Sequence, residues 1–347
     1  MSILIIPLFS IGQFNEESQN FVSFVQDQFI EKSEAIQELS DVFLTYSLAS
    51  LLEGDGVTWP YVTVPFDQFD KHARRVTSFP YDGIAFVAPV VSDVTNWNSY
   101  CAEVMSESNI PMSQNMFTFY GNGSQLVSGA GPFLPLHQVY PTPIFIDSLN
   151  GSIVNYDMSS DPEWNISATL ANTFDQIVLS GLLSSGMIRD AYPDIFDATE
   201  PISTLINPIL SRTAETSDLV GYAQSTFKWK SIFSKFDGAS KYFYCTVDNT
   251  CGESFSFVVD QHNVTFTDSE YSTDLWINDI STTSYIGIKY VNVSMEDVRQ
   301  AGICLYSITA YPTSKFRQEY DFNAAMYATI VGIILVFNLF TFFAFDQ

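Results

Sequence analysis

The chain has 347 residues, of which 46% are hydrophobic, so it is long and apolar enough to bury a core and is not intrinsically disordered. Its 39 acidic residues outnumber 14 basic ones and give a formal net charge of −25. This charge repels phosphate groups, which argues against a nucleic-acid-binding protein and against adsorption to an anionic membrane surface.

The N-terminal segment, residues 1–13, is apolar, but no Lys or Arg precedes its apolar stretch. A signal peptide usually has a basic start and a longer apolar region. We therefore interpret residues 1–13 as the outer end of a transmembrane helix. A short signal peptide and a buried strand are the alternatives.

Residues 14–50 have the pattern of one long helix, which we call the stalk helix. Apolar side chains recur at heptad spacing in two rows, and further apolar residues widen the stripe. A wide stripe is typical of a helix that packs on a globular domain, and we expect such packing together with a dimer contact. A simple core helix is the alternative. The rows are Val22, Phe29, Ile36, Phe43 and Val25, Leu39, Tyr46, the second interrupted by Lys32.

Strands and helices alternate after the stalk helix, which predicts an α+β fold with two antiparallel-sheet modules. We place the modules at residues 51–198 and 199–319, with the break between residues 193 and 208. The predicted strands are 61–64, 83–91, 140–146, 219–226, 242–247, 254–259 and 302–311; the predicted helices are 66–76, 93–107, 165–183 and 228–236, with a loop over 121–135.

The C-terminal segment, residues 320–347, contains 22 uncharged residues at 324–345. As a helix these would extend ~33 Å, close to the thickness of the hydrocarbon layer of a bilayer. We predict a transmembrane helix, with a buried core helix as the alternative. Asn338 is its one strongly polar residue and would favour hydrogen bonding across a helix pair.

Two features favour an oxidising location outside the cytosol. Cys245 and Cys251 lie six residues apart around a turn-like Asp-Asn-Thr, a spacing that predicts a disulfide across a hairpin loop, with two reduced thiols as the alternative. We therefore expect residues 14–319 to lie outside the cytoplasm, with the plasma membrane as the anchoring membrane. Five sequons predict N-glycosylation, at Asn122, Asn150, Asn165, Asn263 and Asn292.

The sequence offers little catalytic chemistry. Its three histidines, His72, His137 and His262, lack the spacing of a metal-binding helix pair. It has no phosphate-binding GxxxxGK loop, no dinucleotide-binding GxGxxG and no GxSxG nucleophile turn. We expect no enzyme activity, metal or cofactor in this chain.

Several segments, in their order and spacing, resemble the CHASE-type extracellular sensor region of microalgal receptor-type nucleotide cyclases. The resemblance covers residues 14–347. The aromatic strand and the helix after it carry the similarity to CHASE modules, and the later segments carry the similarity to the cyclase receptors. The segments are 59–66 (WPYVTVPF), 67–75, 83–91 (GIAFVAPVV), 97–100 (WNSY), 132–139 (PFLPLHQV), 200–202 (EPI) with Pro208, 220–221 (VG), 229–233 (WKSIF), 245–252 (CTVDNTCG) and the closing apolar helix.

The resemblance implies a stalk helix, a membrane-distal and a membrane-proximal PAS-like module, and a membrane helix on either side. A cyclase domain would follow Gln347, so that activity is not assigned to this chain. The distal module would bind an unidentified small molecule in a pocket that is mainly apolar and aromatic, with a few polar anchors. The candidate lining residues are Phe86, Tyr140, Phe145 and Asp147 on the expected central strands, with Arg75 as an anion anchor or, alternatively, as a partner of nearby acids.

The sequence therefore favours a membrane-anchored extracellular sensor that works as a homodimer in the lipid bilayer. A stand-alone surface glycoprotein or ligand-binding protein without cytoplasmic output is the main alternative. An anchored hydrolase is a third reading, which the scattered histidines disfavour.

Overall fold

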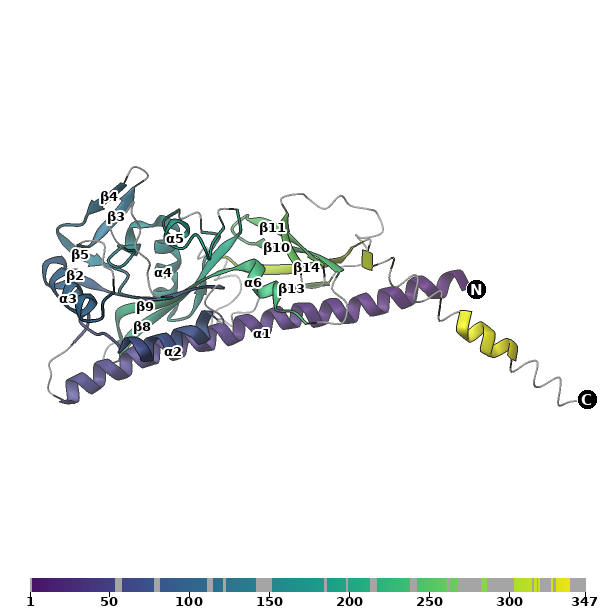
Figure 1. The fold of residues 1–347 in the computed structure, drawn as a ribbon, viewed down its shortest axis with the longest axis horizontal. Coiled ribbons are helices and arrows are strands. Elements are labelled where there is room, and N and C mark those ends of the chain that lie inside the picture. The colour runs from purple at the N-terminus through teal and green to yellow at the C-terminus, as the bar shows by residue number, and fades with distance from the viewer. Residues whose placement is uncertain are drawn as a thin grey trace, which may run out of the picture.

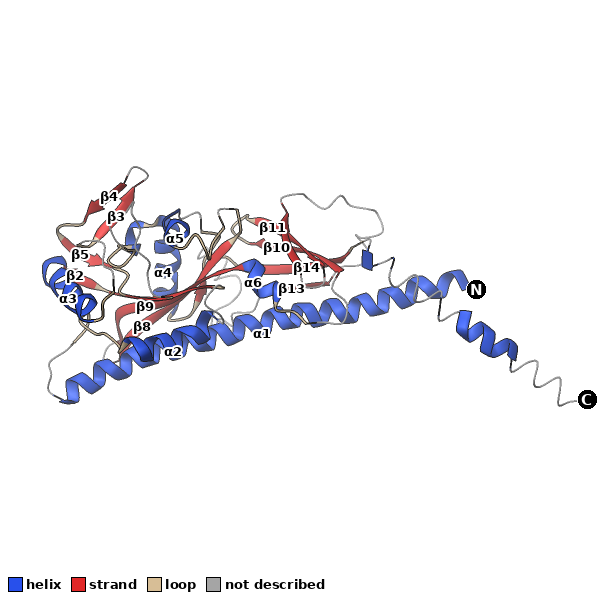
Figure 2. Ribbon diagram, in the orientation of Figure 1, coloured by secondary structure: helices blue, strands red, loops and turns tan. Residues whose placement is uncertain are grey.

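The fold contains one very long helix that runs beside two five-stranded antiparallel sheets (Figure 1). Figure 2 shows the strands gathered on one side of this helix. The computed structural model describes residues 2–53, 58–77, 82–110, 115–120, 123–141, 152–183, 186–197, 199–212, 217–237, 242–260, 263–267, 282–285, 303–313, 315–316, 318, 326 and 329–337.

The long helix, α1 (Ser2–Glu53), confirms the predicted stalk helix and extends it towards the N-terminus. Residues 2–13 are helical, which excludes a strand there. The predicted apolar rows face the two sheets: Val25, Phe29 and Ile36 are all buried. Among the α1 side chains that the structure describes, this stripe packs within the chain, as expected for packing on a globular domain, and the dimer contact stays a prediction.

The first sheet has the strand order β6-β1-β9-β8-β7, and all of its strand pairs are antiparallel. Its interior strand β1 is buried at every position, because helices cover both faces of the sheet. Helix α2 (Phe66–Thr77) packs with α1 on one face, and helix α4 (Pro162–Phe174) packs on the other. The strands are β1 (Gly83–Pro89), β6 (Gln138–Tyr140), β7 (Val178–Leu179), β8 (Ile202–Arg212) and β9 (Ser217–Lys228).

The second sheet has the order β12-β11-β10-β14-β13 and is also antiparallel. Its inner face packs against α1 and the short helix α6 (Trp229–Ser234) in one continuous apolar core. The strands are β10 (Tyr242–Asn249), β11 (Ser254–Asp260), β12 (Asn263–Thr267), β13 (Thr282–Tyr285) and β14 (Tyr306–Pro312).

The predicted module boundary at residue 199 is wrong. Strands β8 and β9 pair with β1 and belong to the first sheet, so the change of sheet falls between residues 228 and 242. The sequence pattern hid β8 because Pro208 lies inside it. On one side of β8, the short strand β7 pairs only with residues 205 and 206, so Pro208 has no strand partner there. The N–H that proline lacks therefore interrupts no hydrogen-bond ladder between β7 and β8.

Smaller elements surround the first sheet and include strands in the predicted loop at 121–135. Two helices begin at side-chain caps: Asp93 accepts hydrogen bonds from the backbone of α3, and Asp161 does the same for α4. Helix α4 ends earlier than predicted, because Asp175 adopts the left-handed conformation. The remaining elements are β2 (Val91–Asp93), α3 (Val94–Glu107), β3 (Phe117–Tyr120), β4 (Gly123–Leu126), β5 (Ala130–Phe133), η2 (Met158–Ser160) and α5 (Gly186–Ala191).

The predicted disulfide between Cys245 and Cys251 is wrong. Cys251 is bonded to Cys304, and Cys245 is a buried free thiol. Cys245 lies in the middle of β10, opposite Phe257 and Ala310, while Cys251 lies in the turn beyond the end of that strand. The last residue of β10, Asn249, is four residues after Cys245, and an extended chain of that length spans about 14 Å. Cys251 lies beyond that strand end, too far from Cys245 for a disulfide.

The C-terminal apolar segment is described at residues 326 and 329–337, which are helical. In the part of the chain that the structure describes, no helix has both the length and the apolar content needed to span a bilayer. Residues 338–345 of the predicted span, with Asn338, lie outside the described residues. Within 329–337 the large apolar side chains are exposed, with Ile333 at 63% and Phe337 at 68%. This described portion is therefore not a core helix of the domain.

Candidate functional site

The predicted pocket residues Phe86 and Tyr140 do not share a site. Tyr140 of β6 pairs with Ala85 of β1, so the next residue, Phe86, points to the opposite face of the sheet. Phe86 belongs to the apolar core beneath α4, whereas Tyr140 belongs to the core beneath α1 and α2. The prediction that both line one cavity is wrong, since side chains alternate along a strand.

Of the other predicted pocket residues, only Arg75 is described by the structure. Phe145 and Asp147 are outside the described residues. Arg75 lies exposed on α2 and forms an ion pair with Glu38 of α1. Pairing with a nearby acid was the alternative for Arg75, and the structure supports it over the anion anchor. The pair connects α2 to α1.

The face beneath α4 contains a polar group that the sequence pattern did not indicate. Gln224 of β9 is directly opposite Phe86 of β1 and is completely buried. Its Oε1 accepts a hydrogen bond from the indole N–H of Trp164 on α4, and its Nε2 has no hydrogen-bond partner among the residues that the structure describes. A buried donor without a partner costs about 1–3 kcal/mol, so this amide is a favourable place for an acceptor atom of a ligand.

Aromatic groups enclose the Gln224 amide. The rings of Trp164 and Tyr222 lie edge to face, with centroids 5.5 Å apart. The Tyr222 hydroxyl donates to the carbonyl of Ala168 in α4 at 3.0 Å, and burial raises the pKa of Tyr222 to about 12. We call Phe86, Trp164, Tyr222 and Gln224 the α4-face cluster. All four side chains are buried in the core beneath α4, where one amide lies among aromatic rings.

A second buried polar group lies just before the start of β6. The hydroxyl of Thr63 is 2.5 Å from the hydroxyl of Tyr100 and 2.7 Å from Nε2 of His137. His137 is almost completely buried against the ring of Trp97, and its Nδ1 has no hydrogen-bond partner within the described part of the chain. Burial lowers the pKa of His137 to about 3, so this imidazole is neutral at ordinary pH and acts as a core residue.

An open groove of about 490 Å³ lies between α1 and the segment that follows α6. Carboxylates, amides and one ammonium group surround a small aromatic base in this groove. Its mixed polar lining differs from the buried, mainly aromatic α4-face cluster. The lining residues are Gln13, Glu16, Glu17, Asn20 and Phe24 of α1 with Lys235, Phe236 and Asp237.

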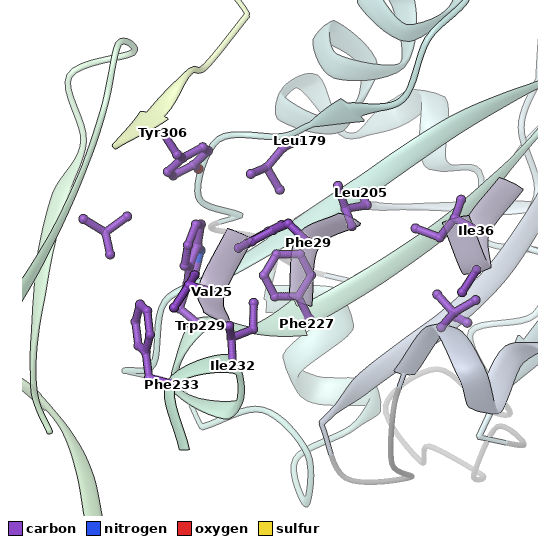
Figure 3. Close-up of a cluster of buried hydrophobic side chains, with 14 of the residues drawn as sticks. Val25, Phe29, Ile36, Leu179, Leu205, Phe227, Trp229, Ile232, Phe233 and Tyr306 are labelled. Atoms are coloured by element: carbon purple, nitrogen blue, oxygen red, sulfur yellow. The ribbon is translucent and has the colours of Figure 1, made fainter. Parts of the chain in front are cut away.

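Buried hydrogen bonds join the two sheets. The indole of Trp229 donates to Ser203 of β8 at 3.0 Å, and the hydroxyl of Tyr306 on β14 donates to the carbonyl of Ser180 at 2.9 Å. The rings of Trp229 and Tyr306 are 4.9 Å apart. Figure 3 shows these two rings beside Phe29 of α1. The first sheet, the second sheet and α1 therefore meet at one packed junction.

The junction continues at the surface, beside the disulfide. The carboxylate of Glu253 accepts the backbone N–H of Leu182 at 2.9 Å, which connects the β10–β11 turn to the segment after β7. In the same turn, Thr250 donates to the carbonyl of Ile303, next to Cys304. The disulfide thus fixes a turn that holds the two sheets together.

Two predicted glycosylation sites are accessible in the structure. Asn165 is exposed on α4, and Asn263 is exposed at the start of β12. Asn122, Asn150 and Asn292 lie outside the described residues. Comparisons with protein-family models and with curated proteins found no match for this chain.

Proposed function

We propose that this protein is a membrane-anchored extracytoplasmic sensor that binds a small molecule between its first sheet and α4. Binding would change the position of α1, and α1 would relay that change to the membrane. The observation that carries the proposal is the course of α1. This helix packs against both sheets, and it begins at the same end of the molecule as the exposed apolar helix at 329–337 (Figure 1).

The exposed apolar segment supports the anchoring part of the proposal. Contiguous apolar surface of this kind is unfavourable in water at about 25 cal/mol per Å² and favourable in hydrocarbon. The bilayer is the partner that fits an uncharged apolar helix, as the uncharged run over 324–345 predicts. The described part of this helix has no cover from the fold.

The α4-face cluster supports the ligand-binding part. A ligand between the first sheet and α4 would be mainly apolar and would present one hydrogen-bond acceptor to Nε2 of Gln224. If the two sheets and α1 have two arrangements, the ligand shifts the equilibrium between them only by the difference between its affinities for the two arrangements. The junction at Trp229 and Tyr306 supplies a packed route from the first sheet to the second sheet and to α1.

The wider hypothesis keeps the resemblance to CHASE-type sensors. In that hypothesis both modules are PAS-like, the working unit is a homodimer in the plasma membrane, and any nucleotide cyclase domain lies outside this chain. Catalysis is not part of the proposed role.

Membrane anchoring is tested by placing charges in the exposed helix. Ile333→Asp with Val336→Asp should move the full-length protein from the carbonate-resistant membrane fraction to the soluble fraction, because each central charge opposes insertion by about 2.5–3.5 kcal/mol. Ile30→Asp on α1 is the matched control, since Ile30 is also an exposed apolar residue. Equal membrane retention of the double variant and the wild type would refute the anchoring role of this segment.

A further inference from the structure

A lysine is buried in the middle of the stalk helix. Lys32 interrupts an apolar row of α1, and its side chain is only 2% exposed. Its ammonium nitrogen donates to the backbone carbonyl of Val76 at 2.9 Å and lies 5.8 Å from the centre of the Phe227 ring. The side chain therefore sits where α1, α2 and β9 meet.

The acceptor comes from the last turn of α2. Carbonyl groups in the last turn of a helix have no partner within the helix and carry the negative end of the helix dipole. Lys32 satisfies one of them, so its amino group connects α1 to the end of α2. A neutral amine makes this hydrogen bond as well, but it avoids the cost of burying a charge.

Three charged groups, one on α1 itself and two on other segments, act on this site with opposing signs. Glu31 on α1 and Asp82 before β1 favour the ammonium form, whereas Lys235 after α6 opposes it. Lys235 forms an ion pair with Asp82 at 2.8 Å, and this pairing weakens the electrostatic stabilisation of the Lys32 ammonium by Asp82. The α2 and β9 sides contribute a carbonyl and an aromatic ring. Burial is the largest influence and lowers the pKa of Lys32 from 10.5 to about 7.

We propose that Lys32 is a proton-sensitive contact that makes the docking of α1 on α2 and the first sheet depend on pH. The neutral amine packs at the α1–α2–β9 junction, and protonation weakens this docking. The input is the proton, and the element that responds is the helix that runs along both sheets. This inference rests on the geometry around Lys32 and does not depend on the proposed sensor function.

The sign of the effect follows from the two pKa values. Between pH 7 and 10.5 the unfolded chain holds a proton on Lys32 that the folded chain has released. The folded state therefore becomes more stable as pH rises through this window, and the added stability is absent below about pH 7. The unfolding equilibrium constant falls by up to about tenfold for each pH unit at which the difference is one full proton.

The experiment measures unfolding of the full-length protein in detergent micelles from pH 6 to 9.5. The wild type should gain stability with pH more steeply than Lys32→Met, which loses the titrating group and keeps the apolar stem. Lys71→Met is the matched control, because Lys71 is exposed on α2, and it should keep the wild-type slope. Equal slopes for the wild type and Lys32→Met would overturn the proposal.

A second measurement does not require a folded variant. In wild-type protein labelled at lysine ¹³Cε, one lysine signal should titrate near pH 7, well below exposed lysines at about 10.4. Hydrogen exchange, corrected for intrinsic pH dependence, should show less protection at the end of α2 at pH 6 than at pH 9. Titration of every lysine above pH 9 would contradict the proposal.

Discussion

The disulfide between Cys251 and Cys304 yields the most quantitative prediction. It joins two residues 53 positions apart in sequence, so its removal releases a long loop in the unfolded chain. Loop-closure entropy gives a stabilisation of roughly 4 kcal/mol for a loop of this length. We expect the double variant Cys251→Ser with Cys304→Ser to lose about that free energy of unfolding.

The loss should extend to the contact between the sheets. The β10–β11 turn carries Glu253, whose carboxylate holds the backbone of Leu182 beside β7. Releasing Cys251 loosens this turn, so hydrogen exchange at the backbone amide of Leu182 should increase more than exchange at the centre of β1. Urea unfolding of the purified protein measures the global effect, and exchange mass spectrometry measures the local one.

Cys245→Ala is the control. Cys245 is a buried free thiol, and burial raises its pKa, so it is unreactive in the folded protein. This change removes one sulfur atom and no cross-link, so the released-loop effect should be absent. Peptide mapping without reduction should recover a Cys251–Cys304 peptide. A Cys245–Cys251 peptide, or equal stability of the double variant and the wild type, would refute the reasoning.

Variants at three further positions test other parts of the structure. Phe29→Ala should reduce the free energy of unfolding by about 3–5 kcal/mol, measured by urea denaturation, because Phe29 is buried against Phe227 and Trp229; a loss below 1 kcal/mol would contradict that packing. His137→Gln should flatten the loss of stability between pH 6.5 and 3, because only the unfolded chain protonates this imidazole there, at up to ~1.4 kcal/mol per pH unit; an unchanged pH profile would argue against the buried neutral form. Asp161→Ala should lower the free energy of unfolding by about 1 kcal/mol, because it removes the cap of α4, while Asp161→Asn should keep most of the wild-type stability. Equal losses for the two variants in thermal unfolding would argue against capping.

The predicted elements succeeded where local pattern and burial agree. The heptad rows predicted α1 because a helix of this length can bury one continuous stripe on a long neighbour. The apolar run at 83–91 predicted a central strand, since both faces of β1 are covered. Strand β8 was missed because a proline such as Pro208 ordinarily indicates the end of a strand. That it is tolerated here depends on the shortness of the adjacent strand β7, which the sequence pattern does not show.

The candidate site was less predictable than the fold. Phe86 was identified as buried, but its relation to Tyr140 depends on the register of β6 against β1, which lies outside local sequence pattern. Gln224 gave no signal, because a glutamine in a strand is ordinarily read as surface-facing. Its burial opposite Phe86 and its bond to Trp164 come from three segments that are distant in sequence.

By itself, the sequence determined the long amphipathic helix, the α+β class, the acidic charge and the uncharged C-terminal run, because each depends on neighbouring residues along the chain. Tertiary structure alone decided the division between the sheets, the partner of Cys251 and the burial of Lys32, because these depend on which distant segments meet. Strand register and helix docking are set by packing of whole faces, and single-residue spacing does not encode them.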